Sequence, residues 1–433
     1  MNVNRRSFLA GTTAAMVMPN VALASPTILR AEPVVAQILP EGDGTTAMLG
    51  FNGSTPGPEL RFRQGDEVSV QFENQTDEGS SLHWHGIRLA NAMDGVPGLT
   101  QPLVLAGQRF DYQFQVPDAG TYWYHSHNRS WEQVAKGLFG PLIIEEQNPP
   151  LVDHDITVML DDWRIEETGA LMGGFGNTHD FAHAGRMGNY AKILPSRDTV
   201  RHGDRIRLRL INTATARIFP LKIEGLDGMV VALDGMPLQA PRPLAEVTLA
   251  PAQRIDVIGN VTGTVDFLFV ARDGLYELGG ITADGENTTP ISDAIAELPA
   301  ADVATPKEQP DHSLTLRMEG GAMGGRHAGD DIWAFNGVSG LPDVPWAQFQ
   351  RGQTVMIDLV NDTSFPHGIH LHGHHFNEVN PDGTLGDIRD TSLVDARQSQ
   401  KIAVVFDNPG KWLLHCHMLG HQASGMKTWV EVL

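Results

Sequence analysis

Three stretches of the chain repeat one pattern of alternating hydrophobic and polar positions. Each begins at a turn glycine, continues as a segment in which every second residue is apolar, and ends at an asparagine nine residues after the glycine. They cover residues 65–74, 203–212 and 352–361. A period of two predicts strands with one buried and one solvent-exposed face, as in antiparallel sheets. The three glycines are 138 and 149 residues apart, so the repeating unit has the size of a domain.

The remaining apolar segments are short, and Gly, Pro, Asn and Asp separate them, while helical periodicity is rare. This pattern favours an all-β chain of three consecutive antiparallel β-sandwich domains. We expect the domains at residues 25–147, 148–305 and 306–433, with linkers near 147–153 and 298–310.

Residues 1–24 have the features of a removable export signal. Arg5-Arg6 precedes Phe8-Leu9 and a mildly apolar stretch, which ends in the small-residue cleavage pattern Ala22-Leu23-Ala24. The arginine pair indicates the twin-arginine export machinery as a partner; the alternative is an ordinary signal peptide with a chance arginine pair. No run of 18 apolar residues follows. We therefore expect no membrane span and a periplasmic mature protein.

Composition narrows the function classes. The chain of 433 residues is 41% hydrophobic and 19% charged, as expected of a soluble globular protein. Its 31 basic and 52 acidic residues give a formal charge of −21, which argues against a nucleic-acid partner. An acidic surface suits cationic or neutral small molecules, or serves solubility alone. The single cysteine, Cys416, is a free thiol that is either buried and inert or occupied by a ligand.

Four His-x-His pairs stand at matching places in the first and third repeats. Two begin 18 residues after the turn glycine, two begin five residues after a later glycine, and the middle repeat has no histidine at these places. On a strand, residues i and i+2 share a face, so each pair presents two imidazoles on one side. If the outer domains pack together, eight imidazoles converge into a metal cluster: His83, His85, His125, His127, His370, His372, His415 and His417.

Cys416 points away from its two flanking histidines, because it occupies the opposite face of the same strand. It can meet His367, His421 and Met426, which lie near it in the same part of the chain. Two imidazoles, a thiolate and a weak thioether form a blue-copper site, whereas structural zinc sites favour several cysteines. Electrons taken up singly at Cys416 can pass along the chain to the histidine cluster. Dioxygen needs four electrons to become water, so one accepting copper and a three-copper cluster store the right number.

These segments resemble the four signatures of the multicopper oxidases: His83-Trp-His-Gly, His125-Ser-His, His367-Gly-Ile-His-Leu-His-Gly and His415-Cys-His-Met-Leu-Gly-His-Gln-Ala-Ser-Gly-Met. The chain is most similar to three-domain bacterial laccase-type enzymes, over essentially the whole mature length. The resemblance implies three cupredoxin-like Greek-key β-sandwich domains and four copper ions. It implies these ligands: His367, Cys416, His421 and Met426 for the type 1 copper; His83 and His370 for type 2; His85, His125 and His417 for one type 3 ion; and His127, His372 and His415 for the other.

The sequence departs from the family pattern at two positions. Gly368 replaces the usual proline after the first type 1 histidine, and Gln422 replaces a glutamate that many bacterial members carry. Water formation also needs four protons, and Gln422 cannot ionise. The resemblance makes Asp94 the candidate catalytic residue for proton delivery; alternatively it is a turn aspartate before Gly95.

The sequence is compatible with two classes of electron donor. We expect a phenol or aromatic amine to give up its electron near an exposed edge of His421 or His367, with Asp390 and Asp395 as weaker candidates for orienting it. We expect no ligand role for the adjacent His374 and His375. The alternative donor is Cu(I), which soft thioethers suit. Its candidate binding residues are Met172, His179, His183 and Met187 in one loop and Met318, Met323 and His327 in another.

Three further functions compete with a phenol-oxidising enzyme. The first is a Cu(I)-oxidising or Cu(I)-sequestering protein of periplasmic copper tolerance. The second is a non-catalytic structural protein of the same fold, which the full set of ligand positions disfavours. The third is copper nitrite reductase, whose relatives have two domains and no cluster built from four histidine pairs.

Overall fold

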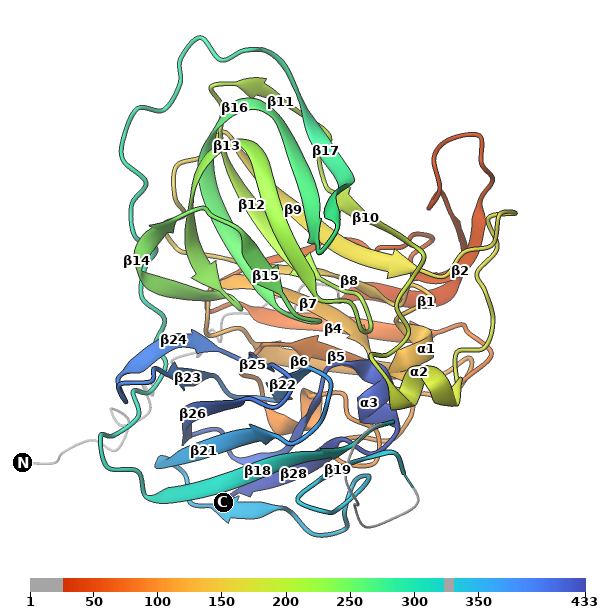
Figure 1. Cartoon of the computed structure of the whole chain (residues 1–433), viewed down its shortest axis with the longest axis vertical. Helices are drawn as coiled ribbons and strands as arrows, with labels where there is room; N and C mark the ends of the chain where they lie inside the picture. Colours follow the sequence, from red (N-terminus) through yellow and green to blue (C-terminus); the bar gives the residue numbers. More distant parts are fainter. Residues whose placement is uncertain (1–25, 323–330) are drawn as a thin grey trace, which may run out of the picture.

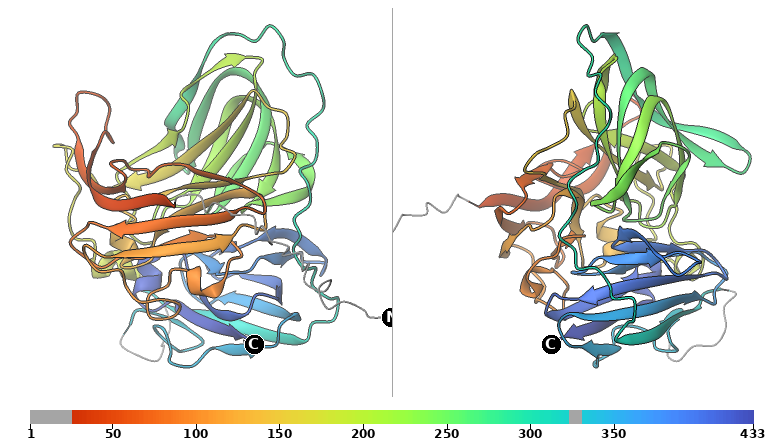
Figure 2. Two further views of the ribbon diagram at one scale, coloured as in Figure 1. Left: turned by 180° about the vertical axis from the view of Figure 1, so that it is seen from behind. Right: turned by 90° about the vertical axis from the view of Figure 1, so that its left-hand side faces the viewer.

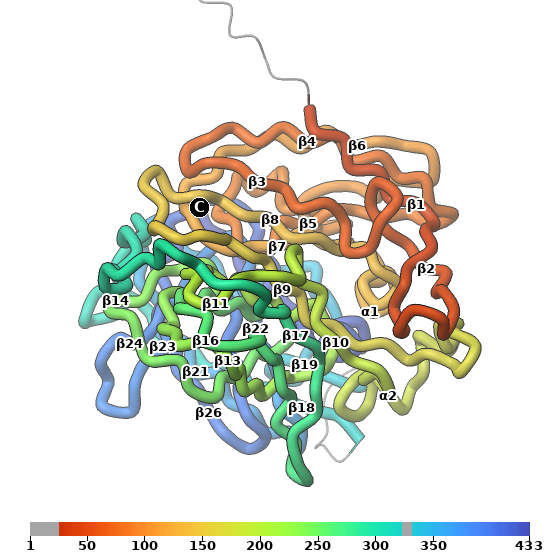
Figure 3. The backbone as a smooth tube through the Cα atoms, turned by 90° about the horizontal axis from the view of Figure 1, so that it is seen from above, coloured from red at the N-terminus to blue at the C-terminus, as the bar shows by residue number. Residues whose placement is uncertain are grey.

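The computed structural model describes residues 26–322 and 331–433. The strands fall into three consecutive units along the chain, and each unit contacts the other two (Figures 1 and 2). Seen from above, the first unit lies beside the middle unit, with the C-terminal unit beneath (Figure 3). The all-β prediction is confirmed. The predicted export signal and two of the candidate copper-binding residues, Met323 and His327, lie outside the described residues.

The N-terminal unit consists of two four-stranded sheets, ordered β2-β1-β4-β6 and β3-β8-β7-β5. Its elements are β1 (Thr27–Ala36), β2 (Thr46–Phe51), β3 (Leu60–Arg63), β4 (Glu67–Asn74), β5 (Leu82–His85), the 3-10 helix η1 (Asn91–Met93), β6 (Arg109–Gln115), β7 (Gly120–Ser126), α1 (Ser130–Gln133) and β8 (Phe139–Glu145).

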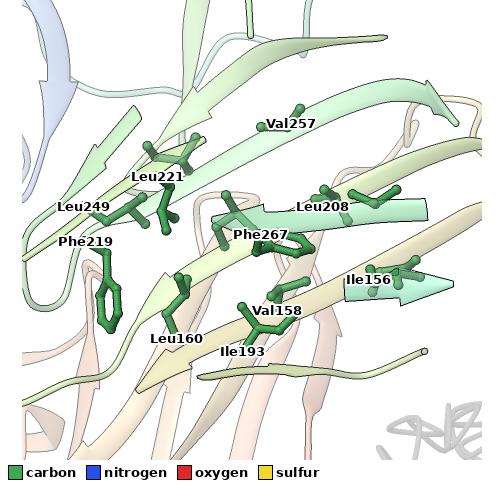
Figure 4. Packing of buried hydrophobic residues seen from close by; sticks show 14 of the residues in the cluster. Ile156, Val158, Leu160, Ile193, Leu208, Phe219, Leu221, Leu249, Val257 and Phe267 are labelled. Carbon is green, nitrogen blue, oxygen red and sulfur yellow. The ribbon is translucent and has the colours of Figure 1, made fainter. Parts of the chain in front are cut away.

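The middle unit forms a nine-stranded sheet whose long strands β13 and β16 curve around the core (Figure 1). Its elements are β9 (His154–Trp163), α2 (Thr178–Ala182), β10 (Tyr190–Pro195), β11 (Thr199–His202), β12 (Arg205–Asn212), β13 (Phe219–Leu233), β14 (Met236–Pro243), β15 (Val247–Leu249), β16 (Arg254–Ala271) and β17 (Gly274–Glu286). Figure 4 shows Leu160, Leu208 and Phe267 among the buried side chains that fill this unit.

The C-terminal unit pairs a six-stranded sheet, β19-β18-β21-β26-β23-β24, with a five-stranded one, β20-β28-β27-β22-β25. Its elements are β18 (His312–Gly320), β19 (Trp333–Phe335), β20 (Ala347–Phe349), β21 (Gln353–Asn361), β22 (His367–Leu371), β23 (Phe376–Val379), β24 (Leu385–Arg389), β25 (Thr391–Val394), β26 (Ser399–Phe406), β27 (Gly410–Cys416), α3 (Leu419–Ala423) and β28 (Lys427–Val432). The domain boundaries inferred from the sequence stay a prediction; both fall between strands of different sheets.

The three repeated segments correspond to β4, β12 and β21. Each pairs in parallel with the first strand of its unit, respectively β1, β9 and β18. Each also pairs antiparallel with a later strand, respectively β6, β16 and β26. The repeat in the sequence is therefore a repeat of topology.

The asparagine that ends each repeated strand has the same task in all three units. Asn74, Asn212 and Asn361 are buried, and each side-chain amide donates to carbonyls of two separate segments of the chain. The Asn361 amide, for example, donates to the carbonyls of Phe365 (2.7 Å) and Val394 (3.1 Å). Such bonds satisfy buried backbone groups and fix the loops. In the third unit they fix the turn that leads into His367.

Candidate metal centres

Strand pairing brings the histidine pairs side by side within each outer unit. In the N-terminal unit β5 runs antiparallel to β7, with His83 opposite His125. In the C-terminal unit β22 runs antiparallel to β27, with His370 opposite His415. Two neighbouring strands thus present four imidazoles on one face of each unit, as the alternation predicted.

The two faces meet, and the eight predicted cluster histidines are all buried at the junction. Rings from the two units approach closely: the centroids of His83 and His372 are 4.0 Å apart, and those of His85 and His370 are 3.8 Å apart. Their nitrogen atoms form three groups in which the candidate ligand atoms lie within 4.8 Å of one another: His83, His85 and His370; His85, His125 and His417; and His127, His372 and His415.

One nitrogen of most of these rings is already used within the protein. Nδ1 of His83 donates to the Asp94 carbonyl (2.7 Å), and Nδ1 of His370 donates to the Asp390 carbonyl (2.9 Å). Nδ1 of His415 donates to the Cys416 carbonyl (2.9 Å). Such bonds fix the ring and leave the other nitrogen as a metal ligand.

The other nitrogens fit a metal cluster, because they are buried and have no hydrogen-bond partner in the described part of the chain. This holds for Nε2 of His83, His125, His127 and His370, for Nδ1 of His85, and for both ring nitrogens of His417. An unpartnered buried polar atom costs about 1–3 kcal/mol. Burial lowers the pKa of His125 and His417 well below the ordinary value, which keeps these rings neutral, the form that binds metal. The donor set is all imidazole, as suits copper.

Two buried carboxylates flank the cluster. Asp94 accepts a hydrogen bond from Nδ1 of His372 (3.0 Å), so the structure places this predicted residue beside the cluster. Asp390 lies 3.2 Å from Nε2 of His85. Burial acts to raise the pKa of Asp390, but the Arg254 guanidinium holds it well below its usual range. The expectation that Asp390 orients an organic donor is wrong, because it is fully buried at the cluster; Asp395 is exposed.

A second centre lies on the opposite face of β27. The Cys416 sulfur is 3.6 Å from Nδ1 of His367 and 3.7 Å from Nδ1 of His421, and these two nitrogens are 3.1 Å apart. Met426 is buried, and its carbonyl accepts a hydrogen bond from the Cys416 backbone amide (3.0 Å). Burial raises the pKa of the Cys416 thiol to about 12, so a bound cation is needed to stabilise the thiolate.

The expectation of an exposed histidine edge at this centre is wrong. His367 and His421 are both fully buried. Nε2 of His367 is hydrogen-bonded to the Thr363 hydroxyl (2.8 Å), and Nε2 of His421 donates to the His183 carbonyl (2.6 Å). The end of α2 therefore covers the centre.

Three successive carbonyls dock this end of α2 onto the C-terminal unit. The Phe181 carbonyl accepts from Nε1 of Trp333 (2.6 Å), the Ala182 carbonyl from the Ala322 amide (2.7 Å), and the His183 carbonyl from His421. We call residues 178–183 the α2 cap. No sequence pattern predicts this cap, because a backbone carbonyl has no residue type to recognise.

The remaining candidates for a Cu(I) site differ in exposure. Met172 and Met187 are exposed (39% and 40%), whereas Met318 is buried in the core of the C-terminal unit, so it cannot belong to an exposed Cu(I) site. The His179 and His183 rings stack with centroids 4.0 Å apart.

His374 and His375 are buried beside the cluster but belong to none of the three groups of nitrogen atoms. Gln422 and His127 line a cavity of about 210 Å³ that also contacts Trp131 and Lys427.

Comparison with known proteins agrees with this geometry. Profiles of the family described as multicopper oxidase match residues 35–149, 155–293 and 308–433. The multicopper oxidase MmcO of Mycobacterium tuberculosis is 29% identical, over 90% of this chain and 84% of that protein. Copper resistance protein A of Pseudomonas syringae pv. tomato is 26% identical, over 90% of each. The crystal structure of Lac15 from a marine microbial metagenome is 54% identical, with a TM-score of 0.83, and covers 94% of this chain and 100% of that one.

Proposed function

The chain belongs to the multicopper oxidase family, and from this we propose that it oxidises phenols or aromatic amines one electron at a time. As in the family, dioxygen accepts the electrons, the cofactor is copper, and the fold consists of three cupredoxin-like domains. The observation that carries the proposal is the position of Cys416 between the two candidate metal centres. Its sulfur faces His367 and His421, while its two chain neighbours, His415 and His417, belong to the cluster.

We assign the ligands as the resemblance implies. The type 1 ion takes His367, Cys416, His421 and Met426; the type 2 ion takes His83 and His370; and the two type 3 ions take His85, His125 and His417, and His127, His372 and His415. Copper bound in these sets supplies reversible one-electron redox chemistry and, in the cluster, storage for several electrons. The unpartnered nitrogens and the joint burial of the set support the assignment.

Asp94 is our candidate for supplying protons. Its carboxylate holds Nδ1 of His372 and lies 3.3 Å from Nδ1 of His83, so it contacts histidines of two ligand sets. A carboxylate within hydrogen-bonding reach of the reacting site is the geometry that proton transfer requires. Gln422 lines the neighbouring cavity and can orient water there, but it cannot exchange a proton.

The donor acts across the α2 cap, since neither type 1 histidine is exposed. The His183 ring lies edge-to-face with Phe365 (centroids 5.8 Å apart) and stacks on His179, which is exposed. Aromatic donors gain from such ring contacts. This ring group supports an aromatic donor over a metal ion.

Cu(I) is the second candidate donor. Its support is the exposure of Met172 and Met187 together with the similarity to a copper resistance protein. Thioethers prefer Cu(I) to harder cations.

Oxygen uptake by the copper-loaded protein separates the two donors. We expect a methoxyphenol to be a better substrate than a Cu(I) complex, and we expect Met172→Leu/Met187→Leu to leave phenol oxidation unchanged. Four donor molecules should be oxidised for each dioxygen consumed. A strong preference for Cu(I) that the double variant abolishes would overturn the phenol proposal in favour of copper tolerance.

We also propose export through the twin-arginine route to the periplasm, on the strength of Arg5-Arg6 and the cleavage pattern that follows. Among the described residues, no helix has the length and apolar character needed to cross a bilayer. Arg5→Lys/Arg6→Lys should retain the protein in the cytoplasm of a host that exports the native chain. Unchanged export would contradict the proposed route.

A further inference from the structure

The middle unit supplies none of the assigned ligands, yet one of its side chains reaches the cluster. Arg254, the first residue of β16, is fully buried. It lies where the three units meet: Nε donates to the Thr121 carbonyl of the N-terminal unit (3.0 Å), and Nη1 and Nη2 donate to the Asp390 carboxylate of the C-terminal unit (2.9 and 2.6 Å). The other two N–H groups donate to the carbonyls of Ala252 (3.1 Å) and Asp234 (2.9 Å). All five N–H groups of the guanidinium are used.

Asp390 in turn contacts two of the assigned ligand histidines. The oxygen that accepts from Nη1 of Arg254 also lies 3.2 Å from Nε2 of His85 and accepts from the Thr391 hydroxyl (2.8 Å). The Asp390 main-chain carbonyl accepts from Nδ1 of His370 (2.9 Å). A single residue thus holds one assigned type 3 ligand and one assigned type 2 ligand, which come from different units.

This contact decides which nitrogen of His85 faces the cluster. His83, His125, His370 and His415 use Nδ1 for a hydrogen bond to a carbonyl, which directs Nε2 at the cluster. In His85 the arrangement is reversed, because Asp390 holds Nε2, while Nδ1 has no partner among residues 26–322 and 331–433. The partner of the outer nitrogen sets the orientation of a ligating imidazole.

The backbone next to His85 is shaped around the same ion pair. Gly86 has φ +88°, and a Cβ atom there would lie 2.4 Å from Nη2 of Arg254 and 2.7 Å from the nearer carboxylate oxygen of Asp390. Both distances are too short for any side chain. The glycine after the first histidine pair therefore makes room for the Arg254–Asp390 pair.

We propose that Arg254 is a positioning residue for the copper cluster. Through Asp390 it fixes the rings of His85 and His370, so the middle domain controls assembly of a cluster whose ligands belong to the two outer domains. The inference rests on the ligand assignment of the proposed function. It does not depend on the identity of the donor.

Arg254→Lys and Asp390→Asn test this, with Arg209→Lys as the matched control. Lysine keeps the charge but loses the planar two-point contact, and asparagine keeps the shape of Asp390. Arg209 is also buried in the middle unit, also contacts Thr121 (Oγ1, 2.9 Å), and also pairs with carboxylates, those of Asp155 and Asp256. In the described ranges of the chain, neither of those carboxylates belongs to a group of candidate ligand atoms.

The measurements are copper content per chain, the electron paramagnetic resonance signal of type 2 copper, the near-ultraviolet absorption of the type 3 pair, and the blue absorption of the Cys416 centre. We expect Arg254→Lys and Asp390→Asn to keep the blue absorption and to bind cluster copper roughly 10- to 100-fold more weakly. Arg209→Lys should keep all four properties.

Full copper content with unchanged type 2 and type 3 signals in both test variants would overturn the proposal. Equal loss of these signals in Arg209→Lys would also overturn it, because the effect would then be one of general stability. If Arg254→Lys does not fold, Asp390→Asn alone decides. A native protein without blue colour would instead contradict the proposed function, so the two failures can be told apart.

Discussion

Nδ1 of His372 and a carboxylate oxygen of Asp94 lie 3.0 Å apart, although 278 residues separate them in the chain. The same aspartate accepts a hydrogen bond from Nδ1 of His83 through its main-chain carbonyl (2.7 Å). Asp94 therefore joins the ligand sets of the two outer units, and it is buried. Any change of this side chain acts on both the geometry and the proton supply of the cluster.

Asp94→Asn should lower the turnover number by about 10²- to 10⁴-fold, the range typical of a lost proton-transfer group. The blue absorption should persist, because the Cys416 centre does not contact Asp94. Oxygen uptake measured from acid to neutral pH checks this, with Asp94→Glu as the variant that restores a carboxylate. If Asp94→Asn and Asp94→Glu were equally slow and both lacked cluster copper, Asp94 would serve geometry alone.

Cys416→Ser should remove the blue absorption and reduce oxygen uptake to background. A serine oxygen is a poor substitute for the thiolate that the two histidines flank. Circular dichroism should show the fold intact, since Cys416 is one residue of a large core. Turnover at the native rate would show that electrons are accepted elsewhere.

Asp180→Ala should loosen the α2 cap. Asp180 is buried and accepts two hydrogen bonds from Arg164 (2.7 and 2.8 Å), which anchors the cap to the middle unit. Without this anchor we expect bulky phenols to bleach the blue absorption several-fold faster under anaerobic conditions, because the cap separates them from His421.

The matched control for the cap is Asp362→Ala, which removes an exposed ion pair with Arg317 (2.7 Å). It should leave the bleaching rate unchanged. Slower bleaching in Asp180→Ala would mean that the ring contacts between the cap and the donor outweigh the screening of the centre by the cap.

The copper-free protein should lose stability as the pH falls below about 6.5, the ordinary pKa of histidine. Burial lowers the pKa of His374 to about 3 and that of His375 to about 4. The unfolded chain therefore binds more protons than the folded one below pH 6.5, and each of the two residues lowers the free energy of unfolding by about 1.4 kcal/mol per pH unit. Thermal unfolding between pH 7 and pH 5 measures this.

His375→Leu should reduce this pH dependence because it removes one buried titrating group. Among the residues that the structure describes, neither nitrogen of His375 has a hydrogen-bond partner to lose. His312→Gln, at an exposed position, should not change it. Equal slopes in the native chain and in His375→Leu would contradict the contribution assigned to His375.

Local alternation along the chain was sufficient to predict the strands and the side of each strand on which a ligand stands. Alternation with a period of two separates Cys416 from His415 and His417, and the same local rule pairs His83 with His85. The repeated asparagines indicated three equivalent units. In the structure Asn74, Asn212 and Asn361 each hold the equivalent segments of their own unit.

What surrounds the two centres could not be predicted, because it depends on how the three units pack together. Asp390 is buried at the cluster, and Arg254 reaches it from 136 residues away. The His183 carbonyl covers His421 across 238 residues. Local periodicity specifies which way a side chain points on its own strand. Contacts between units depend on how three separate cores dock, and no local pattern encodes that.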